Sequence, residues 1–316
     1  MILVAGGSGR LGSDVVARLV ARGLPVRVMT RDAARAGAAL ALSGIDRSSV
    51  EIALGDVRDE AAVRSAITGV TTVVSAIQGF GGMHALGVRA VDAEGNRTMI
   101  EAADAAGVEH FVLLSMIGAS PTAPSALARA KGEAERALRA SSLKWTILRP
   151  SAYMETWRSL LGDPILGTGR AQVFGRGTNP LNFVAARDVA VLVERAVVDP
   201  AMRGRVIHVV GPENLSMLDV VGLFRATLGT TVPVRNVPPA ALRVLSLVLR
   251  PMKPVLAGQV AMALTLDILD LRADDGPLRH EFPELPGTRF QAIVAAYVAE
   301  RDASAGRSRE KLDAGH

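Results

Sequence analysis

The stretch that decides the fold is Met1-Ile2-Leu3-Val4-Ala5-Gly6-Gly7-Ser8-Gly9-Arg10-Leu11-Gly12, at the start of the chain. It begins as an apolar run and continues as a glycine-rich turn. Leu11, Val15 and Leu19 then recur at a spacing of four residues, which indicates an amphipathic helix. The order of strand, glycine turn and helix predicts a site where backbone N–H groups and the helix dipole bind a pyrophosphate.

The glycines of this turn fit two spacings of a dinucleotide-binding motif. Gly6, Gly9 and Gly12 form G-x-x-G-x-x-G, and Gly7 with the last two forms G-x-G-x-x-G. Glycine permits a tight turn and a close approach of the backbone to a ligand. The alternative is an ordinary strand-to-helix turn in which glycine serves packing alone. The residues of the turn that we expect to bind the cofactor are Gly6, Ser8, Gly9, Arg10, Leu11 and Gly12.

Strands and helices alternate along the first half of the chain. After the first strand, the apolar runs expected to be strands are 26–29, 50–54, 72–75, 110–115 and 145–148. This alternation predicts an α/β fold with a doubly wound parallel Rossmann sheet. We expect 1–150 to form the dinucleotide-binding domain and 151–302 a smaller α/β substrate-side domain, partly interleaved with the sheet. We expect 303–316 to be a disordered tail.

Two stretches of the chain carry further structural predictions. The stretch 85–106 reads as one long helix that ends at Gly107. The stretch 162–180 is rich in glycine and proline and reads as irregular loops.

The composition narrows the class of protein. The chain has 316 residues, no cysteine, a net charge of +5 and only 3% aromatic residues. Scattered basic residues with few aromatics argue against nucleic-acid binding. The lack of cysteine excludes disulfides and thiolate metal sites and suits a reducing compartment. We expect a cytoplasmic protein, and the histidines and carboxylates show no metal-ligand spacing.

The most apolar stretch is 238–271, which charged residues and prolines interrupt. Its longest uncharged part, 255–266, is too short for a membrane span, which needs about 20 residues. We therefore expect no transmembrane segment. A hydrophobic helical lid, a contact between subunits of an oligomer and a peripheral membrane contact are the alternatives for this stretch.

Ligands of parallel sheets bind beyond the carboxyl ends of the strands. Arg31 follows the second strand, where an arginine can pair with a 2′-phosphate and favour NADP(H) over NAD(H). The alternative for Arg31, as for Arg10, is a solvated surface side chain. Asp56 could accept from the adenine amino group or could simply form a Gly-Asp turn. The other cofactor contacts expected at this edge are Val57, Ser75 and Ala76.

Several stretches of the chain resemble atypical short-chain dehydrogenases, and most closely the branch of NmrA-like NAD(P)H-binding proteins. The matching stretches are 4–12, 26–31, 55–59, 102–115, 131–135, 146–155 and 183–190. The resemblance covers about residues 1–230. Residues 231–302 look like the variable substrate half of such proteins and identify little.

The resemblance implies a catalytic serine and a Tyr-x-x-x-Lys motif. Ser115 matches the serine and Lys131 matches the lysine, but Leu127 stands where the tyrosine is expected. Leucine cannot transfer a proton, so Lys131, Tyr153 and His84 are the alternative acid–base residues.

Lys131 also lies at the edge of an apolar helical stripe, where a lysine needs a partner or a task. It could otherwise extend its ammonium group to water. We expect the other charges of this helix, Glu135 among them, to lie further round it.

Three functions are compatible with these residues. The first is an NADPH-dependent oxidoreductase that transfers hydride to a small, apolar or flat carbonyl, enone or quinone substrate. The second is a non-catalytic NADP(H)-sensing regulator or assembly partner. The third is a nucleotide-sugar epimerase or dehydratase, which Leu127 disfavours because that chemistry relies on the missing tyrosine.

Overall fold

The computed structural model describes residues 1–79, 87–249, 257, 260 and 264–313. The chain divides into two compact units, and neither unit is one continuous stretch. Unit 1 comprises Met1–Ser151, Ala186–Val209 and His280–Leu285. Unit 2 comprises Ala152–Ala185, Val210–Arg279 and Pro286–His316. The chain therefore leaves unit 1 after the sixth strand, returns to it for one further helix and strand, and returns again for His280–Leu285.

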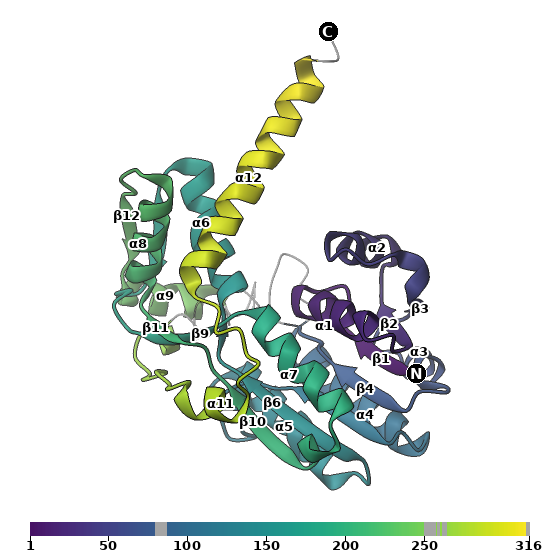
Figure 1. Cartoon of the computed structure of the whole chain (residues 1–316). Coiled ribbons are helices and arrows are strands. Elements are labelled where there is room, and N and C mark those ends of the chain that lie inside the picture. The colour runs from purple at the N-terminus through teal and green to yellow at the C-terminus, as the bar shows by residue number, and fades with distance from the viewer. Residues whose placement is uncertain (80–86, 250–256, 258–259, 261–263, 314–316) are drawn as a thin grey trace. The chain divides into compact units, whose positions relative to one another are not determined.

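Unit 1 is built from a sheet and the helices that flank it (Figure 1). Its elements are β1 (Ile2–Ala5), α1 (Arg10–Ala21), β2 (Val26–Thr30), α2 (Ala33–Leu42), η1 (Arg47–Ser49), β3 (Glu51–Leu54), α3 (Glu60–Ile67), β4 (Thr72–Ser75), η2 (Arg89–Gly95), α4 (Asn96–Ala105), β5 (His110–Leu114), α5 (Ala126–Ala140), β6 (Lys144–Pro150), α7 (Ala186–Val198), η3 (Pro200–Met202) and β10 (Arg205–Val209).

The seven strands of this sheet are all parallel, in the order β10-β6-β5-β4-β1-β2-β3. Strand β1 lies between β4 and β2, so the direction of winding reverses at β1. Doubly wound sheets bind dinucleotides beyond the carboxyl ends of their strands at this reversal. The glycine turn follows β1 directly and therefore lies at that point. The predicted fold class, an α/β protein with a doubly wound parallel sheet, is confirmed.

Both faces of the sheet are covered by helices. Leu3, Phe111 and Leu113 belong to a core cluster that also contains residues of α3, α4 and α5. Helices α1 and α7 cover the opposite face (Figure 1), where Val28 packs near the glycine turn and α1. Burial on both faces explains why the central strands are continuously apolar rather than alternating.

The single helix expected over 85–106 is more complex in the structure. Residues Arg89–Gly95 form a π-helix, η2, which continues into α4, while 85 and 86 lie outside the described residues. Apolar periodicity indicates a helix but does not resolve the wider π-turn, which is often associated with functional sites. At the end of this turn Gly95 packs so closely that an added Cβ would lie 2.8 Å from Val57 Cγ2.

Unit 2 contains shorter strands and several helices. Its elements are β7 (Ala152–Tyr153), α6 (Met154–Thr168), β8 (Ala171–Phe174), β9 (Leu181–Val184), β11 (Glu213–Leu215), α8 (Met217–Leu228), β12 (Val234–Val237), α9 (Pro239–Leu249) and α12 (Phe290–Asp313), with α11 (Gly276–Glu281) on the boundary with unit 1. Strands β11, β9 and β7 form one sheet, and β12 pairs with β8. In the described part of the chain, no helix is both long enough and apolar enough to cross a membrane.

The prediction of irregular loops over 162–180 is wrong for most of that stretch. Helix α6 continues to Thr168 and contains Pro164, and strand β8 follows at Ala171–Phe174. Gly162 serves packing here, because an added Cβ would lie 2.6 Å from the ring of Phe224. At the end of the chain, α12 spans Phe290–Asp313 and so includes most of the stretch 303–316 that we expected to be a disordered tail.

Candidate functional site: the glycine turn and the ends of β4 and β5

The glycine turn after β1 is too tightly packed for larger residues. Gly6 has a φ of +84°, which side chains disfavour, and an added Cβ there would lie 2.6 Å from the Ala76 carbonyl oxygen. At Gly12 an added Cβ would lie 2.1 Å from the Gly6 carbonyl oxygen. The Gly9 N–H donates to that same oxygen at 2.9 Å. The turn thus brings the start of α1 directly against the ends of β1 and β4.

The amino end of α1 differs from those of three other helices in unit 1. Helices α2, α3 and α5 each have a side chain that accepts from their first N–H groups, namely Asp32, Asp59 and Ser125. Within the described residues 9–13, α1 has neither a capping side chain nor an acidic residue in its first turn. An anion is the complement that such an end favours.

Around this turn, Ser8 and Leu11 are partly buried and Arg10 is exposed, with its Nε 3.7 Å from Asp14 Oδ2. Arg31 is also exposed, directly after β2. The exposed positions of Arg10 and Arg31 fit a phosphate contact and a solvated side chain equally well. Their roles in cofactor binding therefore stay predictions from the sequence.

Asp56 is engaged within its own turn. Its carboxylate accepts from the Arg58 backbone N–H at 3.0 Å and from the Arg58 guanidinium at 2.8 Å. Arg58 holds the pKa of Asp56 below its usual range, and Arg31 adds a smaller effect. The turn-forming role is therefore present in the structure, whereas the adenine contact stays a prediction.

Ser75 and Ala76 follow β4 at the centre of the sheet. Ala76 donates its N–H to the Ala5 carbonyl oxygen at 2.9 Å and so extends the pairing of β4 with β1. The buried Ser75 hydroxyl donates to Asn96 Oδ1 at 2.6 Å. Val57, which is partly buried, packs against the core cluster beside Gly95. These residues shape the edge where the cofactor is expected.

Lys131 is buried on α5, and its ammonium group is engaged by groups of the protein. Its Nζ donates at 3.0 Å to each of the carbonyl oxygens of Ile77 and Leu114 and forms an ion pair with Asp92 Oδ1 at 3.0 Å. Two of its three N–H donors thus have carbonyl acceptors, whereas the buried Asp92 Oδ1 balances its charge without accepting a hydrogen bond. The alternative in which Lys131 reaches water is excluded, because its side chain is only 7% exposed. Leu127 lies one turn earlier on α5 and is partly buried.

Asp92 is a buried partner of Lys131 that sequence reasoning missed. Besides the ion pair, its Oδ2 accepts from the Gly79 N–H at 2.8 Å. Asn96 Nδ2 donates to the Asp92 backbone oxygen at 2.8 Å. Asp92 and Lys131 therefore hold the backbone of 77–79 from two sides. The sequence position of Asp92 could have indicated its burial. Asp92 precedes Asn96 by four residues and Met99 by seven, so it lies on the same apolar helix face.

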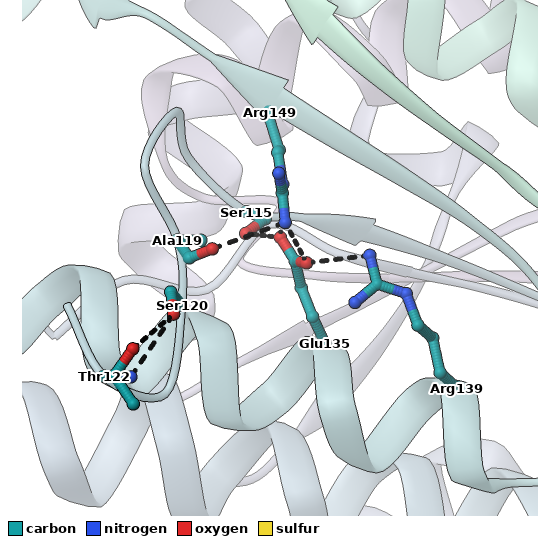
Figure 2. Close-up of polar contacts among 7 residues, drawn as sticks. All are labelled: Ser115, Ala119, Ser120, Thr122, Glu135, Arg139 and Arg149. Atoms are coloured by element: carbon teal, nitrogen blue, oxygen red, sulfur yellow. Dashed lines mark hydrogen bonds and ion pairs between the residues drawn. The ribbon is translucent and has the colours of Figure 1, made fainter.

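Ser115, the expected catalytic serine, donates its hydroxyl to a buried carboxylate. Figure 2 shows Ser115, at the end of β5, pointing at Glu135 of α5, with an Oγ–Oε1 distance of 2.5 Å. Glu135 also accepts from the Arg149 guanidinium at 2.6 and 2.8 Å and from Arg139 at 3.1 Å. Arg149 reaches on to the Ala119 carbonyl oxygen at 3.3 Å. The Ser115 proton is thus directed into the protein.

Glu135 corrects the sequence interpretation of α5. From the sequence we placed it with the charges that lie further round the helix, but it is 1% exposed. The error arises because Arg149 and Arg139 neutralise it, and a paired carboxylate can occupy an apolar face. Its spacing of four residues from Lys131 was the signal that could have revealed this.

Tyr153 belongs to unit 2, where it ends β7 and precedes α6. It is partly buried, and burial raises the pKa of its hydroxyl well above the usual range, with a smaller contribution from Glu155. The phenol is therefore protonated at neutral pH. His84, the other proton donor considered from the sequence, lies outside the described residues.

A doubly wound parallel sheet with a glycine turn and an uncapped helix at the reversal of winding defines a dinucleotide-binding α/β protein. A family model described as NAD(P)H-binding matches residues 6–200. The chain belongs to this NAD(P)H-binding family, within the NmrA-like branch of the atypical short-chain dehydrogenases.

Three known proteins illustrate the similarity. The NAD(P)H azoreductase of Xenophilus azovorans is 30% identical over 75% of this chain and 76% of its own length. The (4-alkanoyl-5-oxo-2,5-dihydrofuran-3-yl)methyl phosphate reductase of Streptomyces griseus subsp. griseus is 32% identical over 72% and 74%, respectively. An NADPH-dependent quinone oxidoreductase of Escherichia coli, solved with NADPH, has a TM-score of 0.71 at 24% identity, covering 94% of this chain and all of that one. The last likeness concerns the fold alone.

Proposed function

We propose that this protein is an oxidoreductase that binds NADPH in preference to NADH and reduces a small, flat or apolar acceptor. The acceptors that we propose are carbonyl compounds, enones and quinones. The observation that carries the proposal is the glycine turn at the reversal of the sheet, which leaves the amino end of α1 available to a pyrophosphate. The reductase names of two curated relatives support the same reaction class.

The residues of unit 1 fit such a cofactor. The N–H groups of the turn and the positive end of α1 would hold the pyrophosphate, and Arg31 would pair with a 2′-phosphate. Ser75 and Ala76 would form the wall on the β4 side. When bound, the nicotinamide supplies the hydride.

Lys131 acts in this proposal as a positioning residue. Its contacts with Asp92 and the Ile77 carbonyl fix the segment after β4, close to the glycine turn. A ribose hydroxyl that bound Lys131 would compete with these contacts, because two of the three N–H donors already have carbonyl acceptors. The sequence prediction of a direct catalytic or ribose-binding role for Lys131 is the alternative to test.

The proton for the reduced substrate needs a separate donor. Ser115 is engaged with Glu135, so its hydroxyl would have to leave a charge-assisted hydrogen bond to serve a substrate. Tyr153 carries its proton at neutral pH, as any tyrosine does, although burial raises its pKa and so makes it a weaker acid. We propose Tyr153 or a water molecule as the proton source, and we assign unit 2 to the substrate.

An NADP(H)-sensing regulator or assembly partner is the second candidate, because the Lys131 and Ser115 side chains are both satisfied internally. The nucleotide-sugar epimerase alternative is not favoured, since Leu127 replaces the tyrosine on which that chemistry relies.

The test measures NADPH oxidation by the purified protein with a panel of quinones, enones, aldehydes and azo dyes. The reaction is monitored as the loss of NADPH absorbance. We expect turnover with at least one quinone or enone, and slower turnover with NADH. Tight NADPH binding without turnover of any acceptor would favour the sensor. The absence of binding would overturn both candidates.

A further inference from the structure

Helix α9 (Pro239–Leu249) of unit 2 exposes a continuous apolar face. Val244, Leu247 and Val248 are 62%, 68% and 59% exposed, whereas Leu242 is fully buried. Positions i, i+3 and i+4 lie on one side of a helix, so the three exposed residues form one stripe. Single exposed apolar residues are ordinary, but a stripe of large aliphatic side chains indicates a surface that meets an apolar partner.

The stretch of sequence that contains this stripe carries charges of one sign only. Between Asp219 and Asp267 the sequence contains no acidic residue. The basic residues in the same interval are Arg225, Arg235, Arg243, Arg250 and Lys253. Arg243 lies within α9 itself and is exposed. The whole chain is far more balanced, with 36 basic and 31 acidic residues, so the single sign is a local property of this part of unit 2.

We propose that α9 binds to the surface of an anionic lipid bilayer, with Val244, Leu247 and Val248 inserted among the acyl chains. An exposed arginine on an aliphatic helix, within a stretch of sequence whose charges are all basic, is the pattern of a helix that lies in the membrane interface. Each arginine or lysine near an anionic leaflet contributes about 1 kcal/mol. Among the described residues, no helix is long and apolar enough to cross a membrane.

A second copy of the chain fits this face less well. Two α9 helices packed through their stripes would bring two sets of basic residues together without an acidic residue from 220–266 to pair with them. Like charges in such an interface oppose association. An anionic lipid surface supplies the complement that the segment itself lacks.

The first experiment is flotation of the full-length protein with vesicles of phosphatidylcholine alone and of phosphatidylcholine mixed with phosphatidylglycerol. We expect the protein to float with the anionic vesicles and to be released by high salt. The variant V244S/L247S/V248S should bind at least about tenfold more weakly, since it removes three apolar side chains from the interface. R243Q should weaken binding to anionic vesicles about fivefold, in line with one lost charge.

The matched control is L42S, which changes an 89% exposed leucine at the end of α2 in unit 1. It should bind vesicles as the unaltered protein does. All substituted residues are exposed, and thermal melts will show that each variant is folded. Because the assay requires no turnover, its outcome is independent of the proposed redox function.

Three results would overturn the proposal. The first is no flotation of the unaltered protein with anionic vesicles, and the second is equal flotation with both kinds of vesicle. The third is a dimer, detected by light scattering, that V244S/L247S/V248S converts to a monomer, because a second copy would then cover the face.

Discussion

The glycine turn and the cluster around Lys131 lie at the same edge of the sheet, but they differ in whether their polar groups have side-chain partners within the protein. At the turn, the first N–H groups of α1 have no side-chain cap among residues 9–13. In the cluster, Lys131 donates to two carbonyl oxygens and pairs with Asp92, and Ser115 donates to Glu135. The first arrangement is open to an external ligand, whereas the groups of the second contact one another within the protein. A match to a catalytic motif therefore identifies a position, and the contacts at that position identify its role.

The largest effect should come from breaking the buried ion pair. We expect K131M to lower the free energy of unfolding by about 3–5 kcal/mol, because it leaves Asp92 buried without its cation. The double variant K131M/D92N should recover part of this loss. Chemical denaturation of the three proteins measures both effects. A K131M protein as stable as the unaltered one would contradict an internal role for Lys131.

A large effect on binding should come from the turn. In G12A, the new methyl group would lie 2.1 Å from the Gly6 carbonyl oxygen and must displace the start of α1. We expect NADPH affinity to fall roughly a hundredfold, since the pyrophosphate contacts depend on that backbone. Isothermal titration provides the measurement. G37A in α2, where an added Cβ meets nothing within 4 Å, is the control and should bind normally.

A smaller effect on binding should distinguish the two arginine interpretations. R31A should weaken NADPH binding about tenfold and leave NADH binding unchanged, because only NADPH carries a 2′-phosphate. R35A removes another exposed arginine of the same region and should change neither affinity. Equal losses for both cofactors in R31A would rule out the 2′-phosphate assignment.

The smallest effect should come from the Ser115 hydroxyl. S115A removes one hydrogen bond to Glu135, which keeps its contacts with Arg149 and Arg139. We expect a loss of about 1 kcal/mol in the free energy of unfolding. Turnover with the best acceptor should change less than about threefold, since a directly catalytic group typically contributes about a hundredfold or more. A hundredfold fall in turnover at unchanged stability would restore Ser115 to catalysis.

The same contrast explains what could be predicted from the sequence. The doubly wound parallel sheet and the position of the glycine turn follow from local patterns, namely apolar runs, glycine spacing and helical stripes. The π-helix at Arg89–Gly95 could not be predicted, because apolar spacing does not separate it from an α-helix. Helix α6 was underestimated because Gly162 and Pro164 were interpreted as loop residues.

The internal polar cluster was missed for a different reason. A charged residue on a helix is placed toward solvent by default, and only a partner from another element makes burial favourable. Asp92 pairs with α5, and Glu135 pairs with Arg149 at the end of β6. Such pairs depend on tertiary structure, so the sequence indicated Lys131 and Ser115 without revealing what they contact.

The central claim is that this chain binds NADPH at the glycine turn. The most direct test is titration of the unaltered protein with NADPH and, separately, with NADH. Binding is monitored by nicotinamide fluorescence. We predict saturable binding of both cofactors at one site, with the lower dissociation constant for NADPH. No saturable binding of either cofactor to the folded protein would contradict the account.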